Sequence, residues 1–193
     1  MINLAEYDIS RSTGFVPEKF PVECLPQDYY QPWESLVENL PALILNKSIR
    51  RLIDTTLPVL STEHLANEGE VRRAYVVLSF LTHAYVWSFD CQPVSSLPPQ
   101  LSTPYTDVAS QLGLPPVATY AALVLWNFKP ALKSPGQTYT DVSKLTIDNF
   151  STVNTFTGSI VAMCFYLIRV QFEFEGAKCL DVGMKAATAA AQN

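Results

Sequence analysis

The longest uninterrupted apolar pattern in the chain runs from residue 72 to residue 87, with no proline or glycine inside it. Apolar side chains recur there at helical spacing and also fill most of the remaining circumference: Ala74, Val76, Val77, Leu78, Phe80, Leu81, Tyr85, Val86 and Trp87. A helix with so little polar surface has to be buried on several sides. Because the run is shorter than the roughly 20 residues that span a membrane, it predicts the central helix of a soluble helical domain.

The segments before this helix predict an irregular arm and then one or two helices. Prolines interrupt residues 1–31 and the position just after them: Pro17, Pro21, Pro26 and Pro32. We therefore expect residues 1–31 to lie over the core as an arm without a long element. Residues 33–53 carry inward apolar side chains at helical spacing and predict one or two helices. Ser61 or Thr62 is the expected N-cap ahead of the central helix.

The next part of the chain predicts two helices followed by a turn-rich segment. Pro104 and Gly113 favour a short helix between them, with Thr103 as its cap. The following stripe has helical spacing and predicts a helix that starts near residue 114: Val117, Tyr120, Ala121, Val124 and Phe128. Residues 129–157 are polar and rich in turn-forming residues, and alternating pieces within 139–147 predict a two-stranded hairpin.

The last part of the chain predicts a strongly apolar helix and a helical tail. Ser159 is the expected cap of a helix over residues 160–174 that Gly176 would stop. The tail over residues 186–193 is rich in alanine and has high helix propensity. The expected fold class is therefore mainly α, with one short two-stranded hairpin.

Composition narrows the possible functions. Hydrophobic residues make up 48% and charged residues 16% of the 193 residues, against a usual charged share of about 25%. Mean hydropathy is +0.12, which indicates a surface that a partner could cover. The net charge of −5, without a Lys/Arg block, argues against nucleic acid binding. The beginning of the chain lacks a signal-peptide pattern, so we expect a cytoplasmic protein.

The residues that carry reactive groups are few and scattered. The four cysteines, Cys24, Cys91, Cys164 and Cys179, have no metal-ligand spacing, so we expect reduced thiols and no metal site. His83 is expected to be a core histidine, and His64 a solvated one. Arg169 and Glu173 stand four residues apart on the apolar helix over 160–174. They are either a helix ion pair or, as the sharper hypothesis, a catalytic pair in which Arg169 holds Glu173 as a general base.

Several blocks of the sequence together resemble fungal-type indoleamine 2,3-dioxygenases. They cover almost the whole chain but only about the first half of the family's usual length. The blocks are YDIS at 7–10, YQPWE at 30–34, LPVLSTE at 57–63, RRAYVVLSFLTHAYVW at 72–87, LGLPPVATYAAL at 112–123, LWNF at 125–128, FTG at 156–158 and FYLI at 165–168.

The resemblance implies a fold, an activity and a pocket. In that family a small helical domain caps a larger helical domain that holds haem, and the usual reaction opens the pyrrole ring of tryptophan with dioxygen. Residues 1–150 would be the small domain and residues 151–193 the start of the large one. The substrate-binding positions carried over are Tyr120, Leu123, Val124, Phe165 and Arg169, and Phe165 matches the aromatic residue that packs on the indole.

The resemblance also shows departures. The family's haem-ligating histidine and the arginine that holds the substrate carboxylate belong to the half that is not matched here. We therefore expect no cofactor for this chain alone, and haem if a C-terminal half completes it. Arg169 stands where relatives usually have a small residue, which would place a permanent charge in the pocket. Residues 160–163 replace a stretch that is often polar in relatives, which suggests a new buried contact.

Three functional hypotheses follow. The first is a repurposed, haem-independent enzyme or binder acting on an indole-like or other aromatic small molecule, by a cyclisation or isomerisation, with Arg169 and Glu173 as catalytic residues. The second is the N-terminal part of a haem dioxygenase that converts tryptophan to N-formylkynurenine together with a C-terminal half. The third is a non-catalytic protein that binds a partner. In each case we expect a homo-oligomer or a second protein to cover the apolar domain face, with no role for nucleic acid or a membrane.

Overall fold

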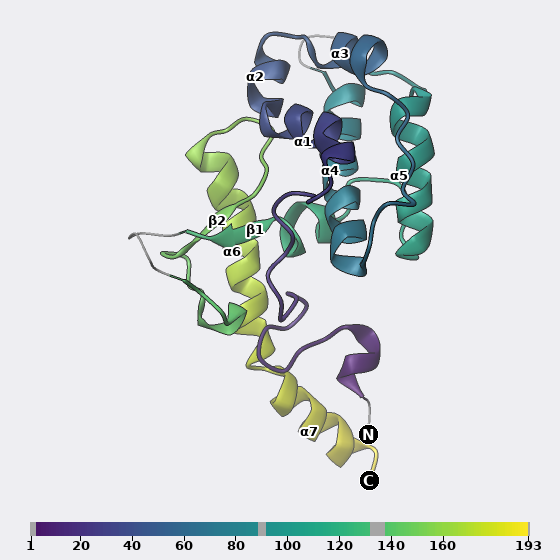
Figure 1. Ribbon diagram of the computed structural model, residues 1–193. Helices are drawn as coiled ribbons and strands as arrows, with labels where there is room; N and C mark the ends of the chain where they lie inside the picture. The colour runs from purple at the N-terminus through teal and green to yellow at the C-terminus, as the bar shows by residue number, and fades with distance from the viewer. Residues whose placement is uncertain (1–2, 89–91, 132–137, 193) are drawn as a thin grey trace.

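The computed structural model describes residues 3–88, 92–131 and 138–192 and is mainly helical (Figure 1). In chain order, the elements are η1 (Leu4–Tyr7), η2 (Asp28–Tyr30), α1 (Gln31–Glu38), α2 (Leu40–Leu45), α3 (Ile49–Thr56), α4 (Glu68–Val86), α5 (Pro99–Gln111), η3 (Ala121–Leu125), β1 (Phe128–Pro130), η4 (Val142–Lys144), β2 (Phe150–Thr152), α6 (Ile160–Ala177) and α7 (Leu180–Ala190). The expected fold class is confirmed.

Helix α4 is the centre of the larger core, as its apolar pattern predicts. Its side chains from Val76 to Leu81 are all buried, and α1, α2, α3, α5 and η3 pack around it (Figure 1). The expectation that Ser61 or Thr62 is the N-cap of α4 is wrong. Asn67 caps α4 by accepting a hydrogen bond from the Glu70 backbone N–H at 3.1 Å, and its amide donates to Glu70 Oε1 at 2.9 Å. Thr62 instead donates to the Asp107 carboxylate on α5.

Two further expectations about local structure are wrong. The helix expected over 104–113 starts at Pro99, because Pro98 and Pro99 occupy the cap and first helical positions and Pro104 is accommodated inside the helix. The stripe that starts at residue 117 does not form one long helix. Only residues 121–125 are helical, as a wide π turn, and Phe128 begins strand β1.

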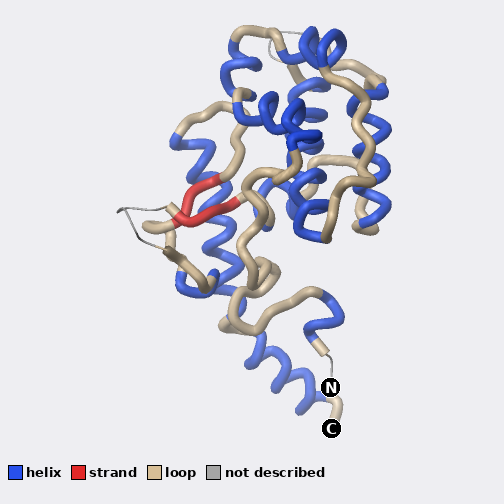
Figure 2. Tube along the Cα trace, in the orientation of Figure 1, coloured by secondary structure: helices blue, strands red, loops and turns tan. Residues whose placement is uncertain are grey.

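A second, smaller core lies between the hairpin and α6. Strands β1 and β2 pair antiparallel, with Phe128 opposite Thr152 and Pro130 opposite Phe150, and they cross α6 in Figure 2. The hairpin therefore exists, but its strands flank the region 139–147 instead of lying within it, because residues 142–144 form the turn η4. This core also contains Val16 from the N-terminal arm and Val124 from η3.

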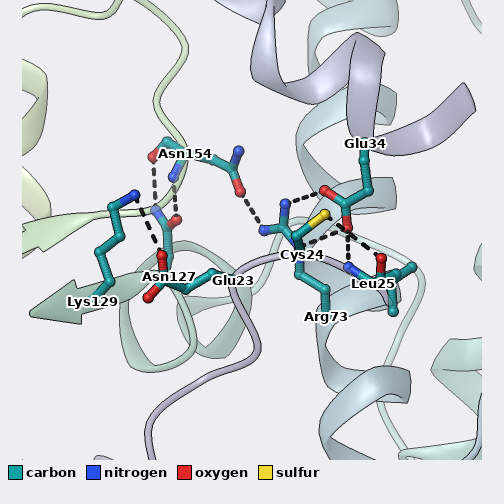
Figure 3. A network of polar contacts seen from close by, with 8 residues as sticks. All are labelled: Glu23, Cys24, Leu25, Glu34, Arg73, Asn127, Lys129 and Asn154. Carbon is teal, nitrogen blue, oxygen red and sulfur yellow. Dashed lines mark hydrogen bonds and ion pairs between the residues drawn. The ribbon is translucent and has the colours of Figure 1, made fainter. Parts of the chain in front are cut away.

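A buried polar network joins the two cores (Figure 3). The Arg73 guanidinium on α4 donates from Nε to Glu34 Oε1 on α1 at 3.0 Å, makes a short contact with Glu34 Oε2, and donates to Asn154 Oδ1 at 2.6 Å. Asn154 exchanges two hydrogen bonds with Asn127: the Asn154 N–H donates to Asn127 Oδ1 at 2.8 Å, and the Asn127 amide donates to the Asn154 carbonyl at 2.9 Å. Glu34 Oε1 also accepts from the Leu25 N–H. The network thus ties the arm, both helices and the hairpin ends together.

The N-terminal arm and the C-terminal helix α7 contact each other. Helix α7 buries none of its residues and extends away from the two cores (Figure 1). Arg11 of the arm forms an ion pair with Asp181 of α7. The expected helical tail is present, but it begins at Leu180 and ends at Ala190. In the described ranges, no helix is long and apolar enough to cross a membrane. The domain boundary expected near residue 150 stays a prediction.

Candidate functional site

Helix α6 buries one face and exposes a broad apolar one. Ser159 caps it, as expected, by accepting from the Ala162 N–H at 3.2 Å. The buried face packs on the second core through Tyr166, Leu167, Val170, Phe174 and Ala177. The opposite face, which we call the α6 open face, consists of Ile160, Val161, Cys164, Phe165, Ile168 and Phe172, all exposed. Large side chains on it remain in solvent, with Phe172 at 75% and Phe165 at 54% exposure. Such a contiguous patch is typical of a surface that another molecule covers.

Arg169 borders the α6 open face and lies against Phe165. Its guanidinium carbon is 3.6 Å from the centre of the Phe165 ring, and its Nη1 donates to the Phe165 carbonyl at 2.6 Å. This is a cation–π contact with an added hydrogen bond along the same helix turn. Among the described residues, no ion pair joins Arg169 to Glu173. Stacking on Phe165 leaves the guanidinium beside the aromatic residue that the resemblance assigns to the indole.

Glu173 is held by Tyr120 instead. The Tyr120 hydroxyl donates to Glu173 Oε1 at 2.9 Å, which links the start of η3 to α6. Partial burial, with a further contribution from the hydrogen bond to Glu173, raises the pKa of Tyr120 to about 12, although the Arg169 charge acts in the opposite direction. At neutral pH the tyrosine is therefore a hydrogen-bond donor. Tyr120, Glu173 and Arg169 form a polar edge along the α6 open face.

Leu123 and Val124 lie behind this edge. Val124 is buried in the second core, and Leu123 is half-buried and packs against both cores. The structure therefore brings Tyr120, Phe165, Arg169 and Glu173 together at the surface and places the other two expected residues beneath it. The arrangement offers a donor, a carboxylate and a guanidinium next to exposed aromatic rings. Such a surface can orient a planar molecule that carries a polar group.

Haem fits this site only in part. The α6 open face provides an apolar wall and one exposed thiol, Cys164, but no imidazole. The His64 ring lies 4.7 Å from the Tyr29 ring. The expectation that His83 is a core histidine is wrong: it is exposed, and its ring lies 5.1 Å from the Phe156 ring. Partial desolvation lowers the pKa of His83. No described cluster of three or more His, Cys, Asp or Glu residues could hold a metal ion. The described residues thus offer an apolar surface against which a haem could lie, but no histidine at that surface that could be its axial ligand.

The described cysteines form no disulfide with one another, and the expectation of reduced thiols stays a prediction. Cys24, Cys164 and Cys179 are free and exposed, and Cys91 lies outside the described residues. Partial desolvation of the sulfur raises the pKa of the Cys24 thiol, and the nearby Glu34 carboxylate adds to that shift.

Sequence reasoning missed two sets of residues. Glu34, Asn127 and Asn154 form the buried network with Arg73, and the signal for it was a charged residue placed inside an apolar helical run. Arg72 and Trp126 meet beside the N-terminal arm, with the guanidinium carbon 4.9 Å from the indole centre. No spacing in the sequence indicates that contact, because the two residues come from distant segments.

Comparison with known proteins identifies the protein family to which the chain belongs. The family model for indoleamine 2,3-dioxygenase matches residues 3–193, so the chain belongs to the indoleamine 2,3-dioxygenase family. The chain is 38% identical over 184 residues to an indoleamine 2,3-dioxygenase of Saccharomyces cerevisiae, a match that covers 94% of this chain and 40% of the relative. It is also 38% identical to an indoleamine 2,3-dioxygenase of Penicillium citrinum, over 100% of this chain and 42% of the relative. Identity to human indoleamine 2,3-dioxygenase 2 is 34%, over 99% of this chain and 44% of the relative.

The chain therefore spans less than half the length of these curated relatives. Family membership is confirmed, together with the expectation that the match covers only part of the family's length.

Proposed function

We propose that this chain supplies one wall of an indole-binding dioxygenase site, and that a further polypeptide segment supplies the opposite wall and the haem ligand. In this proposal, the complete site acts on tryptophan or a related indole. The observation that carries the proposal is the α6 open face, on which six neighbouring side chains, apolar except for one thiol, are exposed beside a polar edge.

The roles of the residues follow from their positions. Phe165 and Phe172 offer exposed rings against which a planar ring can pack. Arg169 lies beside Phe165 and offers donors to a carboxylate or carbonyl group of the bound molecule. Glu173, held by Tyr120, fixes the polar edge. Leu123 and Val124 support η3 from below, which keeps Tyr120 in place.

The share of the relatives' length that the chain covers supports the same proposal. Relatives whose names state dioxygenase activity are more than twice as long as their match to this chain, at 40% and 42% coverage. A segment that corresponds to the rest of such a relative would cover the α6 open face and remove its apolar side chains from water. Each fully buried side chain of this size contributes about 1.5–3 kcal/mol.

The hypothesis of an autonomous, haem-independent enzyme receives less support from the geometry. Cyclisation or isomerisation depends on a site that orients its substrate and excludes water. Tyr120 and Phe165 are 45% and 54% exposed, so the α6 open face by itself is a surface and not an enclosed pocket. Turnover of an indole by the isolated chain would favour that hypothesis over the present proposal.

A chimera tests the proposal. Residues 1–193 replace the matched part of the Saccharomyces cerevisiae relative, and N-formylkynurenine formation from tryptophan is measured with haemin present. We expect the chimera to bind haem and turn over tryptophan, whereas the isolated chain should do neither. A folded chimera that binds haem but forms no product would contradict the proposal.

Variants of the chimera test whether residues of the α6 open face bind the substrate. Phe165→Ala should lower kcat/KM by about tenfold or more through loss of ring packing, and Arg169→Ser should act mainly on KM if the guanidinium binds the substrate. The matched control is Trp87→Ala, which removes a similarly exposed ring from the end of α4, outside the α6 open face. Light scattering of the isolated chain shows in addition whether a second copy covers the face when no other segment is present.

A further inference from the structure

A half-open cavity of about 810 Å³ lies between the N-terminal arm, the first turn of α4 and the end of η3. The arm is the purple segment that runs past the foot of α4 in Figure 1. None of Tyr120, Phe165 and Arg169 lines this cavity, so it is separate from the α6 open face. Its volume is in the range of sites that enclose small organic molecules.

The walls of the cavity are fixed by close contacts of the arm. Gly14 has a φ of +66°, and a Cβ there would lie 2.8 Å from the Glu173 carbonyl oxygen, so only glycine lets the arm approach α6 so closely. Val22 packs on the first turn of α4, where a Cβ on Gly69 would lie 3.3 Å from its side chain. The cavity is thus built by packing between distant segments.

Aromatic rings form the apolar part of the lining. Tyr7 and Phe15 of the arm are 63% and 52% exposed, although both line a concave surface. Trp126 lines the cavity from the end of η3. Large rings that stay exposed within a concavity are available to pack against a planar ligand.

Arg72 is a cation of the lining whose guanidinium contacts both an aromatic ring and carboxylates. Its guanidinium lies over the Trp126 ring at 4.9 Å, contacts Glu68 one turn earlier, and is 3.5 Å from the Asp8 carboxylate. The side chain is only 23% exposed, and its Nε is buried without a hydrogen-bond partner in the described ranges. A partly desolvated guanidinium interacts more strongly with an anionic group than a fully solvated one does.

Carboxylates line the same cavity. Asp8 is 86% exposed at its side chain, and Glu18 accepts from the Ser10 hydroxyl at 2.6 Å. Glu68 is a third carboxylate in the lining, and the cations in it are Lys19, Arg72 and Arg73, of which Arg73 is buried and paired with Glu34. A lining with both signs of charge and several rings disfavours a simple anion or a simple cation, since each would meet a like charge. It is complementary to a molecule that carries both charges and a flat apolar body.

We infer that this cavity binds a small aromatic zwitterion, an α-amino acid with a planar side chain. The α-carboxylate binds beside Arg72, the ammonium group binds near Asp8 and Glu18, and the ring packs against Phe15 and Trp126.

Isothermal titration of the purified chain with three probes tests the inference. L-tryptophan has both charges, tryptamine lacks the carboxylate, and indole-3-propionate lacks the ammonium group. We expect L-tryptophan to bind at least about tenfold more tightly than either analogue, the effect of one charge-assisted contact. Equal affinities for the three probes, or no binding of L-tryptophan at about 5 mM, would overturn the inference.

Two substitutions test which cavity residues bind the charged groups of the ligand. Arg72→Met keeps the length of the side chain and should weaken L-tryptophan about tenfold while changing tryptamine little. Asp8→Asn alters an exposed carboxylate, so the fold is retained, and it should weaken tryptamine but not indole-3-propionate. Arg51→Met, the same change at an exposed position on α3, is the control and should change no affinity. If L-tryptophan binding survives both cavity substitutions, or is lost in Phe165→Ala, the ligand lies elsewhere and the inference fails. The chimera's activity is measured separately, so this failure would leave the proposed function unaffected.

Discussion

The buried pair of Glu34 and Arg73 predicts a large loss of stability when one partner is neutralised. Their side chains are 7% and 3% exposed, and Glu34 accepts two contacts from Arg73 and one from the Leu25 N–H. In Glu34→Gln the Arg73 guanidinium keeps its charge but loses its counterion. The NH2 group of the new amide would also face an N–H donor where a carboxylate oxygen had accepted a hydrogen bond.

The expected magnitude follows from leaving a buried charge unpaired, which costs about 3–5 kcal/mol. That is a large part of the roughly 5–15 kcal/mol by which domains are stable. With a urea m-value near 2 kcal/mol/M, the midpoint of unfolding should fall by about 1.5–2.5 M. The link to Asn154 should weaken as well, because Arg73 would no longer be held in place.

Urea unfolding followed by circular dichroism measures the effect, with Glu38→Gln as the matched control. Glu38 lies on the same helix but is exposed, so its change should stay within about 0.5 kcal/mol. The double variant Glu34→Gln, Arg73→Met removes both charges and should recover much of the loss. A loss below about 1 kcal/mol for Glu34→Gln, or a double variant as unstable as the sum of the single ones, would refute the reasoning.

Other positions give further expected outcomes. Burial raises the pKa of Tyr30 to about 12 from 10.0, so the stability contributed by its neutral phenol is complete below pH 10 and is lost as pH rises toward 12. Urea midpoints across this window should show the loss, and Tyr30→Phe should reduce it. Gly14→Ala should destabilise the protein by at least about 1–2 kcal/mol, because a left-handed φ and the contact with Glu173 both oppose a side chain. Faster limited proteolysis of the arm would confirm this, and an unchanged rate would contradict it. Asn67→Ala removes the cap of α4 and should lower the unfolding free energy by about 1 kcal/mol, whereas no change would show that the Glu70 N–H is satisfied without it.

The long helices could be predicted from the sequence because their signals are local. The run around residues 72–87 has no helix breaker, and Ser159 stands directly before the apolar run of α6. Signals that admit two interpretations were misread. Pro104 suits a first turn, but Pro99 suits it equally well and comes earlier. The pair Asn67 and Glu70 has capping-box spacing, but Ser61 is an equally good cap type and also precedes the helix, so residue type alone does not select the cap.

The site could be predicted only in part, because it depends on which face of α6 is buried. An apolar pattern around the whole helix does not define that face, since Phe165 and Phe174 have equal hydrophobicity and opposite exposure. The four-residue spacing predicts that Arg169 and Glu173 lie close together on the helix. It does not predict which other residues they contact. Phe165 takes the guanidinium and Tyr120 takes the carboxylate. Those choices are set by tertiary packing of η3 on α6.

Alkylation of Cys164 measures most directly whether the α6 open face is a covered wall. Cys164 is an exposed thiol within that face, and Cys24, in the segment before α1, is an internal reference. Mass spectrometry gives the rate for each cysteine in the isolated chain and in the chimera. The proposed function predicts that Cys164 reacts readily in the isolated chain and at least about tenfold more slowly in the chimera, because burial removes the thiol from the reagent, whereas Cys24 keeps its rate. If Cys164 reacts at the same rate in both proteins, the face is not covered and the proposed site does not exist.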